Sequence, residues 1–141
     1  MADIETAKPF SVLFVCLGNT CRSTMSEGIL RHLVKARGLQ DKWVIDSAGI
    51  ADWHKGKPPD EFTVAMLERN GMMDGYHHRA RQITKEDFAK FKYILGMDNY
   101  NIRCLQEIAP LQHSAKAEIE VFEEVYAKCL RCCQRFLDSQ E

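Results

Sequence analysis

The chain lacks an excess of charge of either sign, since 20 aspartates and glutamates nearly balance its 19 lysines and arginines. No overall electrostatic field therefore draws it to nucleic acid or to lipid headgroups, and any bound anion must be held by local geometry. It also lacks an apolar run long enough to span a bilayer, and its first residues include no hydrophobic signal region. We expect a soluble cytoplasmic protein with no nucleic-acid or membrane partner.

The chain also lacks the second half of a zinc motif. Three of its six cysteines, Cys129, Cys132 and Cys133, lie close together, but no further Cys-x-x-Cys or His-x-x-x-His exists to complete a four-ligand site. Their spacing fits one face of a terminal helix, so we predict core packing, with no metal and no cofactor. In a reducing compartment the cysteines are not expected to form a disulfide framework.

Short apolar runs alternate with helical patterns along the 141 residues, with no repeat or linker between them. The patterns predict strands at 11–16, 43–48 and 91–97, and helices at 23–37, 61–70, 99–108 and 122–137, with a capped helical turn at 84–89. This alternation predicts an α/β fold with three layers, a short parallel sheet flanked by helices on both faces. We expect one domain over residues 1–141, with an ordered core at about 10–138.

A loop follows the first predicted strand, which ends at Cys16, and Arg22 comes six positions later. In parallel sheets, ligands bind beyond the carboxyl ends of the strands, where loops lead into helix N-termini. Gly18 and Asn19 tolerate unusual backbone angles, which would turn several N–H groups inward. Together with the helix dipole, these groups would form a cradle for an anion.

The polar residues of this loop fit a nucleophilic site. Arg22 could grip two oxygens of a phosphate, its charge would favour the ionised thiol of Cys16, and Ser23 could donate a hydrogen bond to the sulfur. The alternative is a buried cysteine at the end of a strand, because a Cys-x5-Arg spacing alone is a weak pattern. The position between a buried strand and a helix favours the oxyanion cradle.

Residues 12–23, VLFVCLGNTCRS, resemble the active-site loop of the low-molecular-weight protein tyrosine phosphatases. The resemblance covers nearly the whole chain, in order, through segments 44–48, 52–60, 78–88, 93–98 and 122–133. It implies a phosphatase-type P-loop after the first strand and a tyrosine or acid phosphatase activity. The implied substrates are phosphotyrosine-containing proteins or small aryl phosphates, and the product is inorganic phosphate.

The resemblance also implies roles for individual residues. Cys16 would attack phosphorus to form a phosphocysteine that water hydrolyses, with Arg22 and Ser23 assisting. The substrate would be bound by Leu17, Gly18, Asn19, Thr20, Cys21 and Trp53, the last as an aromatic wall, while His78 and Asp98 would supply supporting hydrogen bonds. Three alternatives stay open: Trp53 as an exposed loop aromatic, His78 as a surface residue, and Cys21 either as a small filler or as a reversible disulfide partner of Cys16.

One family feature is missing. The resemblance implies an acidic Asp-Pro loop between the last strand and the last helix, but this chain has no Asp-Pro, and no aspartate between Asp98 and Asp138. The end of the last strand and the following loop are expected to be truncated at about residues 120–121. General-acid help is typically worth ~10²–10⁴ in rate, so we predict an impaired phosphatase. The alternative is a pseudophosphatase that binds phosphate or phosphotyrosine without turnover.

Four glutamates lie near this junction, and the sequence leaves open whether one replaces the acid or whether they are solvated charges: Glu118, Glu120, Glu123 and Glu124. Thr24, where the family usually has proline, and Gly96, in place of a common cysteine, remove no reacting group. A thiol-coupled arsenate reductase also resembles this fold, but no cysteine lies between Cys21 and Cys104 to form a relay. A poorly folding variant chain is the remaining alternative.

Overall fold

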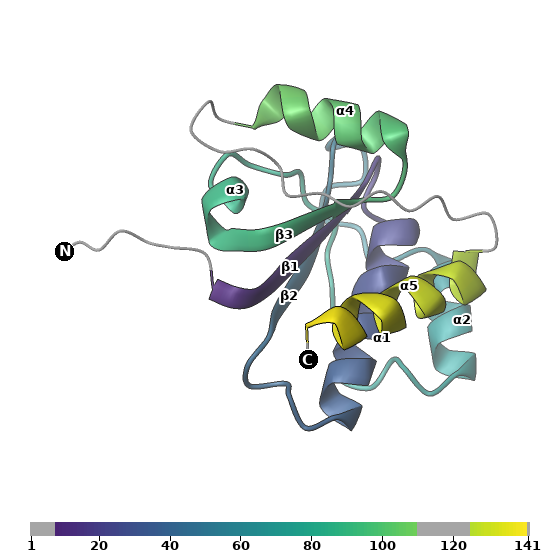
Figure 1. Cartoon of the computed structure of the whole chain (residues 1–141). Helices are drawn as coiled ribbons and strands as arrows, with labels where there is room; N and C mark the ends of the chain where they lie inside the picture. Colours follow the sequence, from purple (N-terminus) through teal and green to yellow (C-terminus); the bar gives the residue numbers. More distant parts are fainter. Residues whose placement is uncertain (1–7, 110–124, 141) are drawn as a thin grey trace.

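The computed structural model describes residues 8–109 and 125–140 (Figure 1). Its three strands are β1 (Lys8–Cys16), β2 (Val44–Gly49) and β3 (Phe91–Gly96), which form a parallel sheet in the order β2-β1-β3. All three predicted strands are confirmed, although β1 begins three residues earlier than predicted. The central position of β1 explains the apolar run at 11–16, whose side chains are all buried, because a strand with a neighbour on each side and helices on both faces is shielded from water.

Helices cover both faces of this sheet (Figure 1). They are α1 (Arg22–Ala36), α2 (Glu61–Arg69), α3 (Asp87–Lys90), α4 (Asn99–Ile108) and α5 (Val125–Ser139). The core is divided accordingly: one buried cluster joins one face of β1 to α1 and α5, and a second joins the other face to α3 and α4. The predicted α/β fold with a parallel sheet between two helical layers is confirmed.

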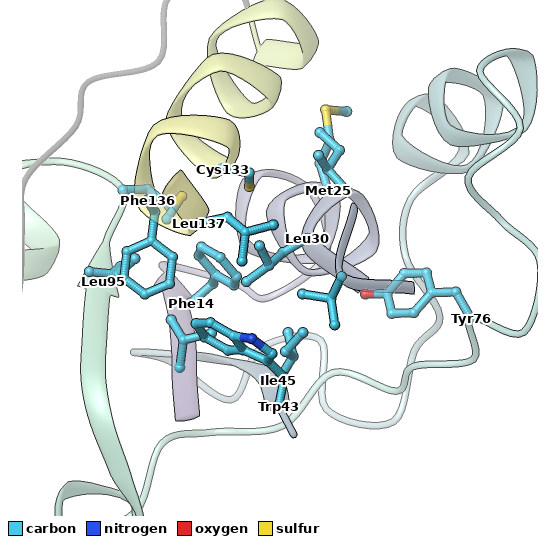
Figure 2. Packing of buried hydrophobic residues seen from close by; sticks show 14 of the residues in the cluster. Phe14, Met25, Leu30, Trp43, Ile45, Tyr76, Leu95, Cys133, Phe136 and Leu137 are labelled. Carbon is cyan, nitrogen blue, oxygen red and sulfur yellow. The ribbon is translucent and has the colours of Figure 1, made fainter. Parts of the chain in front are cut away.

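Successive side chains of β1 point alternately to the two faces of the sheet, so β1 contributes to both clusters. Phe14 packs with Leu30, Phe136 and Leu137 on the side of α1 and α5, as Figure 2 shows. Leu13 points to the opposite face and belongs to the cluster with α4. Burying each of these side chains contributes roughly 1.5–3 kcal/mol, so β1 is held firmly where it leads into the loop after Cys16.

The helix boundaries differ slightly from the predicted ones. Helix α1 begins at Arg22 rather than Ser23, because the N–H of Met25 donates to the carbonyl of Cys21 at 2.8 Å and closes the first turn, and the Thr24 hydroxyl donates to the same carbonyl at 2.9 Å. The predicted core packing of the cysteines near the C-terminus is confirmed for Cys133, which is 2 % exposed. The side chain of Cys129 lies outside the described residues, as do the start of the predicted 122–137 helix and the four glutamates near residue 120.

The ion pair of Asp87 with Arg81, called the ionic clamp below, holds the chain that leads into α3. Both oxygens of Asp87 accept hydrogen bonds from the Arg81 guanidinium, at 2.9 and 3.0 Å, and the Thr84 N–H donates to Asp87 at 2.8 Å. Arg81 also donates to Asp46 on β2 at 3.2 Å. The predicted capped turn therefore exists, although the helix itself begins only at Asp87.

Replacing Asp87 by asparagine is expected to lower the free energy of unfolding by about 2 kcal/mol at neutral pH. Burial alone would raise the pKa of Asp87, but the hydrogen bonds from Arg81 and Thr84 outweigh it and lower this pKa. The carboxylate therefore stabilises the fold above its unfolded pKa of about 4, and this contribution is lost as the pH falls through the lower folded value. Urea unfolding at about pH 7 and about pH 3 measures both effects.

The matched control for this clamp is Asp74→Asn, since that side chain is 89 % exposed and forms only a 3.4 Å pair with Lys35. Its effect is expected to stay below about 0.5 kcal/mol. An Asp87→Asn deficit of the same size at both pH values would contradict the ionic origin of the stabilisation.

Candidate active site

The loop after β1 is packed against the chain that follows β2. The carbonyls of Cys16 and Leu17 accept hydrogen bonds from Ile50 and Ala51, both at 3.0 Å. Gly49 makes this approach feasible, because a Cβ there would lie 2.9 Å from the Leu17 carbonyl oxygen and 3.2 Å from the Cβ of Asn19. The loop is thus fixed by backbone contacts as well as by its own side chains.

The backbone of the loop has an unusual conformation at one of the two positions expected to tolerate it. Asn19 has a φ of 59°, in the left-handed region. Gly18 is not among the residues with positive φ. A Cβ at Gly18 would lie 2.8 Å from Cδ2 of His54, so this imidazole ring would have to shift to admit a larger residue.

Cys16 is 4 % exposed, and its sulfur faces the backbone of this loop. It accepts a hydrogen bond from the N–H of Asn19 at 3.2 Å and lies 3.0 Å from the hydroxyl oxygen of Ser23. Within residues 8–109 and 125–140, the N–H groups of Gly18, Thr20 and Cys21 donate to no protein acceptor. Such a series of backbone donors beside a sulfur suits an oxyanion.

Asn19 connects the loop to the rest of the molecule. Its amide nitrogen donates to Ser23 at 2.9 Å and to Ser47 at 3.0 Å, and its amide oxygen accepts from the N–H of Arg81 at 3.0 Å and from Nε2 of His78 at 2.8 Å. All the hydrogen-bonding capacity of the side chain is therefore used. Of the predicted residues, Asn19 and His78 are brought together, and His78 is buried rather than at the surface.

These contacts also set the direction of the hydrogen bond to Cys16. A backbone N–H can only donate, so the bond from Arg81 identifies the oxygen end of the Asn19 amide and directs its NH₂ group at Ser23. The Ser23 oxygen then accepts from Asn19, and its own proton is available for the sulfur 3.0 Å away. The network therefore orients Ser23 as a donor to Cys16.

Glu27, which the sequence analysis did not identify, terminates this network. It is 1 % exposed and accepts from Ser47 at 2.6 Å, from the Tyr76 hydroxyl at 3.0 Å and from Arg31 at 2.9 Å. Burial, and next the charge of Glu27, raise the pKa of Tyr76, which therefore remains a hydrogen-bond donor. No local signal marks Glu27 in the sequence, because it lies two positions from both Met25 and Ile29 and so away from their helical face.

The same network contains the one group of potential metal ligands found among the described residues: Glu27, Asp46 and His78. Nδ1 of His78 lies 3.3 Å from Glu27 and 3.7 Å from Asp46, and its ring stacks on Tyr76 with centroids 6.3 Å apart. Both carboxylates also receive hydrogen bonds from protein donors. We therefore interpret this group as hydrogen-bond support for the loop.

Arg22 stands at the first position of α1, beside the loop. Its guanidinium pairs with Asp98 at 3.1 Å, and Asp98 also caps α4 by accepting from the N–H of Asn101 at 2.8 Å. Arg22 and Asp98 are therefore brought together, with side chains 29 % and 31 % exposed. Because Asp98 is the N-cap of α4, one end of the Arg22 guanidinium is held at the N-terminus of that helix.

Cys21 and Trp53 have different surroundings. Burial, and next the negative charge of Asp60, raise the pKa of Cys21 despite a hydrogen bond with Thr63, so Cys21 remains a protonated thiol. Cys16 and Cys21 are both free thiols, and a disulfide between them stays a prediction. Trp53 lies beyond β2 with 67 % of its surface exposed.

Replacing Ser47 by alanine is expected to lower kcat about tenfold, because Asn19 loses one of its two acceptors and holds Ser23 less firmly. Ser11→Ala is the control: both hydroxyls are fully buried, but Ser11 accepts from Lys92, away from the loop. Both variants should lose about 1 kcal/mol of stability, and only Ser47→Ala should lose activity. Equal activity in the two variants, or an unchanged rate of Cys16 alkylation in Ser47→Ala, would show that Ser47 is not a positioning residue.

A buried cysteine in a loop of backbone donors, followed by an arginine at the start of a helix, defines a cysteine-dependent phosphatase built on a parallel α/β fold. Residues 11–131 match the family described as low molecular weight phosphotyrosine protein phosphatase. The pig protein of that name is 42 % identical over 150 aligned residues, covering 91 % of this chain and 94 % of its own. The chain therefore belongs to this family of phosphoric monoester hydrolases.

Solved structures agree with this assignment. YfkJ from Bacillus subtilis is 38 % identical with a TM-score of 0.84, and covers 92 % of this chain and 93 % of its own. DARP, described as a drosophila arginine phosphatase, is 35 % identical with a TM-score of 0.80, and covers 92 % and 97 %. No helix in the described part of the chain is long and apolar enough to cross a membrane.

Proposed function

We propose that this chain hydrolyses phosphotyrosine and small aryl phosphates through a phosphocysteine. The observation that carries the proposal is the setting of Cys16, whose sulfur faces the N–H of Asn19 and the hydroxyl of Ser23. The thiolate attacks phosphorus as the bond to the phenolic oxygen breaks, and that oxygen takes up a proton from solvent. Water then attacks the phosphocysteine, which releases inorganic phosphate and regenerates the thiolate.

The residues around the loop have distinct roles in this proposal. Arg22 and the loop N–H groups bind the non-bridging oxygens, where negative charge is held in the transition state. Ser23 donates to the sulfur when it departs in the second step. Asp98 orients Arg22, and His78 orients Asn19, through the contacts described above. Trp53 would stand beside the substrate ring, since its side chain is exposed and can be reached by a substrate.

We further propose that turnover is impaired because the proton donor is missing. The alignment with the pig protein supports this. It spans 150 positions, but 91 % of the 141 residues of this chain is only about 128 residues, so about 22 positions of the alignment have no residue in this chain. No aspartate lies between Asp98 and Asp138, where the acid is expected. The lost segment would include the end of the last strand and the acid loop, at about residues 120–121.

A buried asparagine supports the same proposal. Asn101 on α4 is fully buried, and within the described residues neither its amide oxygen nor its amide nitrogen has a hydrogen-bond partner. Its Cβ would be 3.3 Å from a Cβ at Gly96, so it lies against the end of β3, the outermost described strand on that side. An unsatisfied buried amide costs about 1–3 kcal/mol, and a further strand or loop beside β3 would supply its partners.

Two further candidates follow from specific observations. Without a proton donor, the same loop could bind phosphate or phosphotyrosine without turnover. Phosphoarginine is a second possible substrate, because DARP carries the description of an arginine phosphatase. Asp60 lies near enough to the loop to affect Cys21, and its carboxylate would suit a guanidinium leaving group.

The test separates these candidates by measuring binding and turnover in the same protein. Arg22→Ala is expected to weaken phosphate or vanadate binding about 100-fold, since the guanidinium is the full positive charge at the loop. Arg79→Ala is the control, because Arg79 is exposed and donates to the carbonyl of its neighbour His78 at 3.4 Å, with no other partner among the described residues. Turnover of p-nitrophenyl phosphate with a trapped phosphocysteine supports hydrolysis, and binding alone supports the pseudophosphatase. Phosphate binding that survives Arg22→Ala would refute both.

A further inference from the structure

A cavity of about 530 Å³ lies against the second half of α1 and the start of β2. None of the residues 16–23 lines it, so it is separate from the Cys16 loop. Its apolar wall includes Val34 of α1, Ile45 of β2, and the rings of Trp43 and Tyr76. Figure 2 shows Tyr76 well apart from α5, while the ring of Trp43 also lies against Phe136 of α5, with centroids 5.8 Å apart. The volume is typical of small-molecule sites, which are mostly apolar with a few polar groups.

The polar groups of this cavity are mainly basic. Arg31, His32 and Lys35 line it from α1, against a single acidic residue, Asp74, which is 89 % exposed and only weakly paired with Lys35. The carbonyls at the end of α1, which would repel an anion, already accept hydrogen bonds from the N–H groups of residues 37–39. Aromatic rings beside the cationic side chains of Arg31 and Lys35 are complementary to an aromatic molecule that carries an acidic group.

Two residues of the cavity wall are direct partners of Glu27. Nε of Arg31 donates to one carboxylate oxygen at 2.9 Å, and the Tyr76 hydroxyl donates to the other at 3.0 Å and points toward α1 in Figure 2. Arg31 also donates to the Ile45 carbonyl at 2.6 Å, so its guanidinium joins the helix to the sheet. Glu27 in turn accepts from Ser47, which holds Asn19 of the loop. Hydrogen bonds therefore connect the cavity to Cys16 without a break.

We propose that this cavity is a second ligand site, for an amphipathic aromatic anion, and that its occupant lowers kcat through Glu27. The acidic group of the ligand competes with Glu27 for the Arg31 guanidinium. The carboxylate then shifts relative to Ser47, and the orientation of Asn19 and Ser23 is relaxed. Because the loop stays accessible, we expect kcat to fall about fivefold with KM unchanged, a coupling of ordinary size. The binding half of this proposal is independent of the proposed function.

The probe is 8-anilinonaphthalene-1-sulfonate, an aromatic sulfonate. The chain has two tryptophans, so in a Trp53→Phe background the dye should quench the emission of Trp43. Lys35→Glu is expected to weaken binding about fivefold by replacing an attraction with a repulsion, and Ala36→Phe to weaken it by filling the cavity. Lys42→Glu is the matched charge control: it is exposed and near Trp43, but does not line the cavity, and should change affinity less than about twofold.

Activity is then measured with Trp53 present. Saturating dye should lower kcat on p-nitrophenyl phosphate, and at a dye concentration that half-saturates the parent Lys35→Glu should reduce the effect. If phosphate displaces the dye, or if Lys35→Glu and Ala36→Phe both bind it with unchanged affinity, the site is refuted. Bound dye with unchanged kcat refutes the link through Glu27. If the chain lacks turnover, the alkylation rate of Cys16 replaces kcat, which separates this result from a failure of the proposed function.

Discussion

Cys16→Ser is expected to abolish turnover, with a loss in kcat of at least about 10⁴-fold, while phosphate binding persists. A serine hydroxyl at this position is a far weaker nucleophile than a thiolate and has no general base beside it, since Ser23 is oriented as a donor. Binding persists because Arg22 and the loop N–H groups are unchanged. Turnover of p-nitrophenyl phosphate and calorimetric phosphate binding measure the two properties separately.

The matched control is Cys21→Ser, which replaces a second thiol in the same loop. Because burial raises the pKa of Cys21, that thiol is protonated and contributes no nucleophile, so kcat should change less than about threefold. Iodoacetate should accordingly label Cys16 first, and phosphate should protect it. Equal labelling of the two thiols, or activity that persists in Cys16→Ser, would refute the assignment of the nucleophile.

The loop could be predicted from sequence because all of its essential parts are contiguous. An apolar strand, Cys16, Asn19 and Arg22 fall within a dozen residues, and the strand and helix on either side fix where they lie. The pairing of Arg22 with Asp98 is different: 76 positions separate them, and no spacing rule connects them. That contact arises only because β1 and β3 are neighbours, which places the two residues at the same edge of the sheet.

The support behind the loop could not be predicted for a related reason. Glu27 and Arg31 are four positions apart on α1, which is the usual pattern of a solvated ion pair on a helix surface. In the fold Glu27 is 1 % exposed, because Ser47 of β2 and Tyr76 cover it. A buried carboxylate with several donors and an exposed one with a single lysine or arginine have the same local sequence. Only the tertiary contacts distinguish them.

Phosphotyrosine is expected to be hydrolysed about 10²–10⁴-fold more slowly than p-nitrophenyl phosphate, the range that general-acid catalysis normally supplies. The phenolic oxygen of tyrosine is a poor leaving group, with a pKa of about 10, unless it is protonated as it departs. Nitrophenolate is stable without a proton. In a series of aryl phosphates, kcat should therefore fall steeply as the pKa of the leaving group rises. The pH–rate profile should also lack the decline at high pH that deprotonation of a general acid would cause.

The four glutamates near residue 120 provide the decisive comparison. Replacing Glu118, Glu120, Glu123 and Glu124 together by glutamine should leave the leaving-group dependence unchanged if none of them donates the proton. If the quadruple variant becomes steeper than the parent, one of these carboxylates is the acid, and single variants will identify it. The same acid would activate water in the second step, so a burst of nitrophenol from the parent would locate the slow step at phosphocysteine hydrolysis. Comparable rates on both substrates, unaffected by the quadruple change, would show that a donor exists elsewhere and that the chain is not impaired in the way we propose.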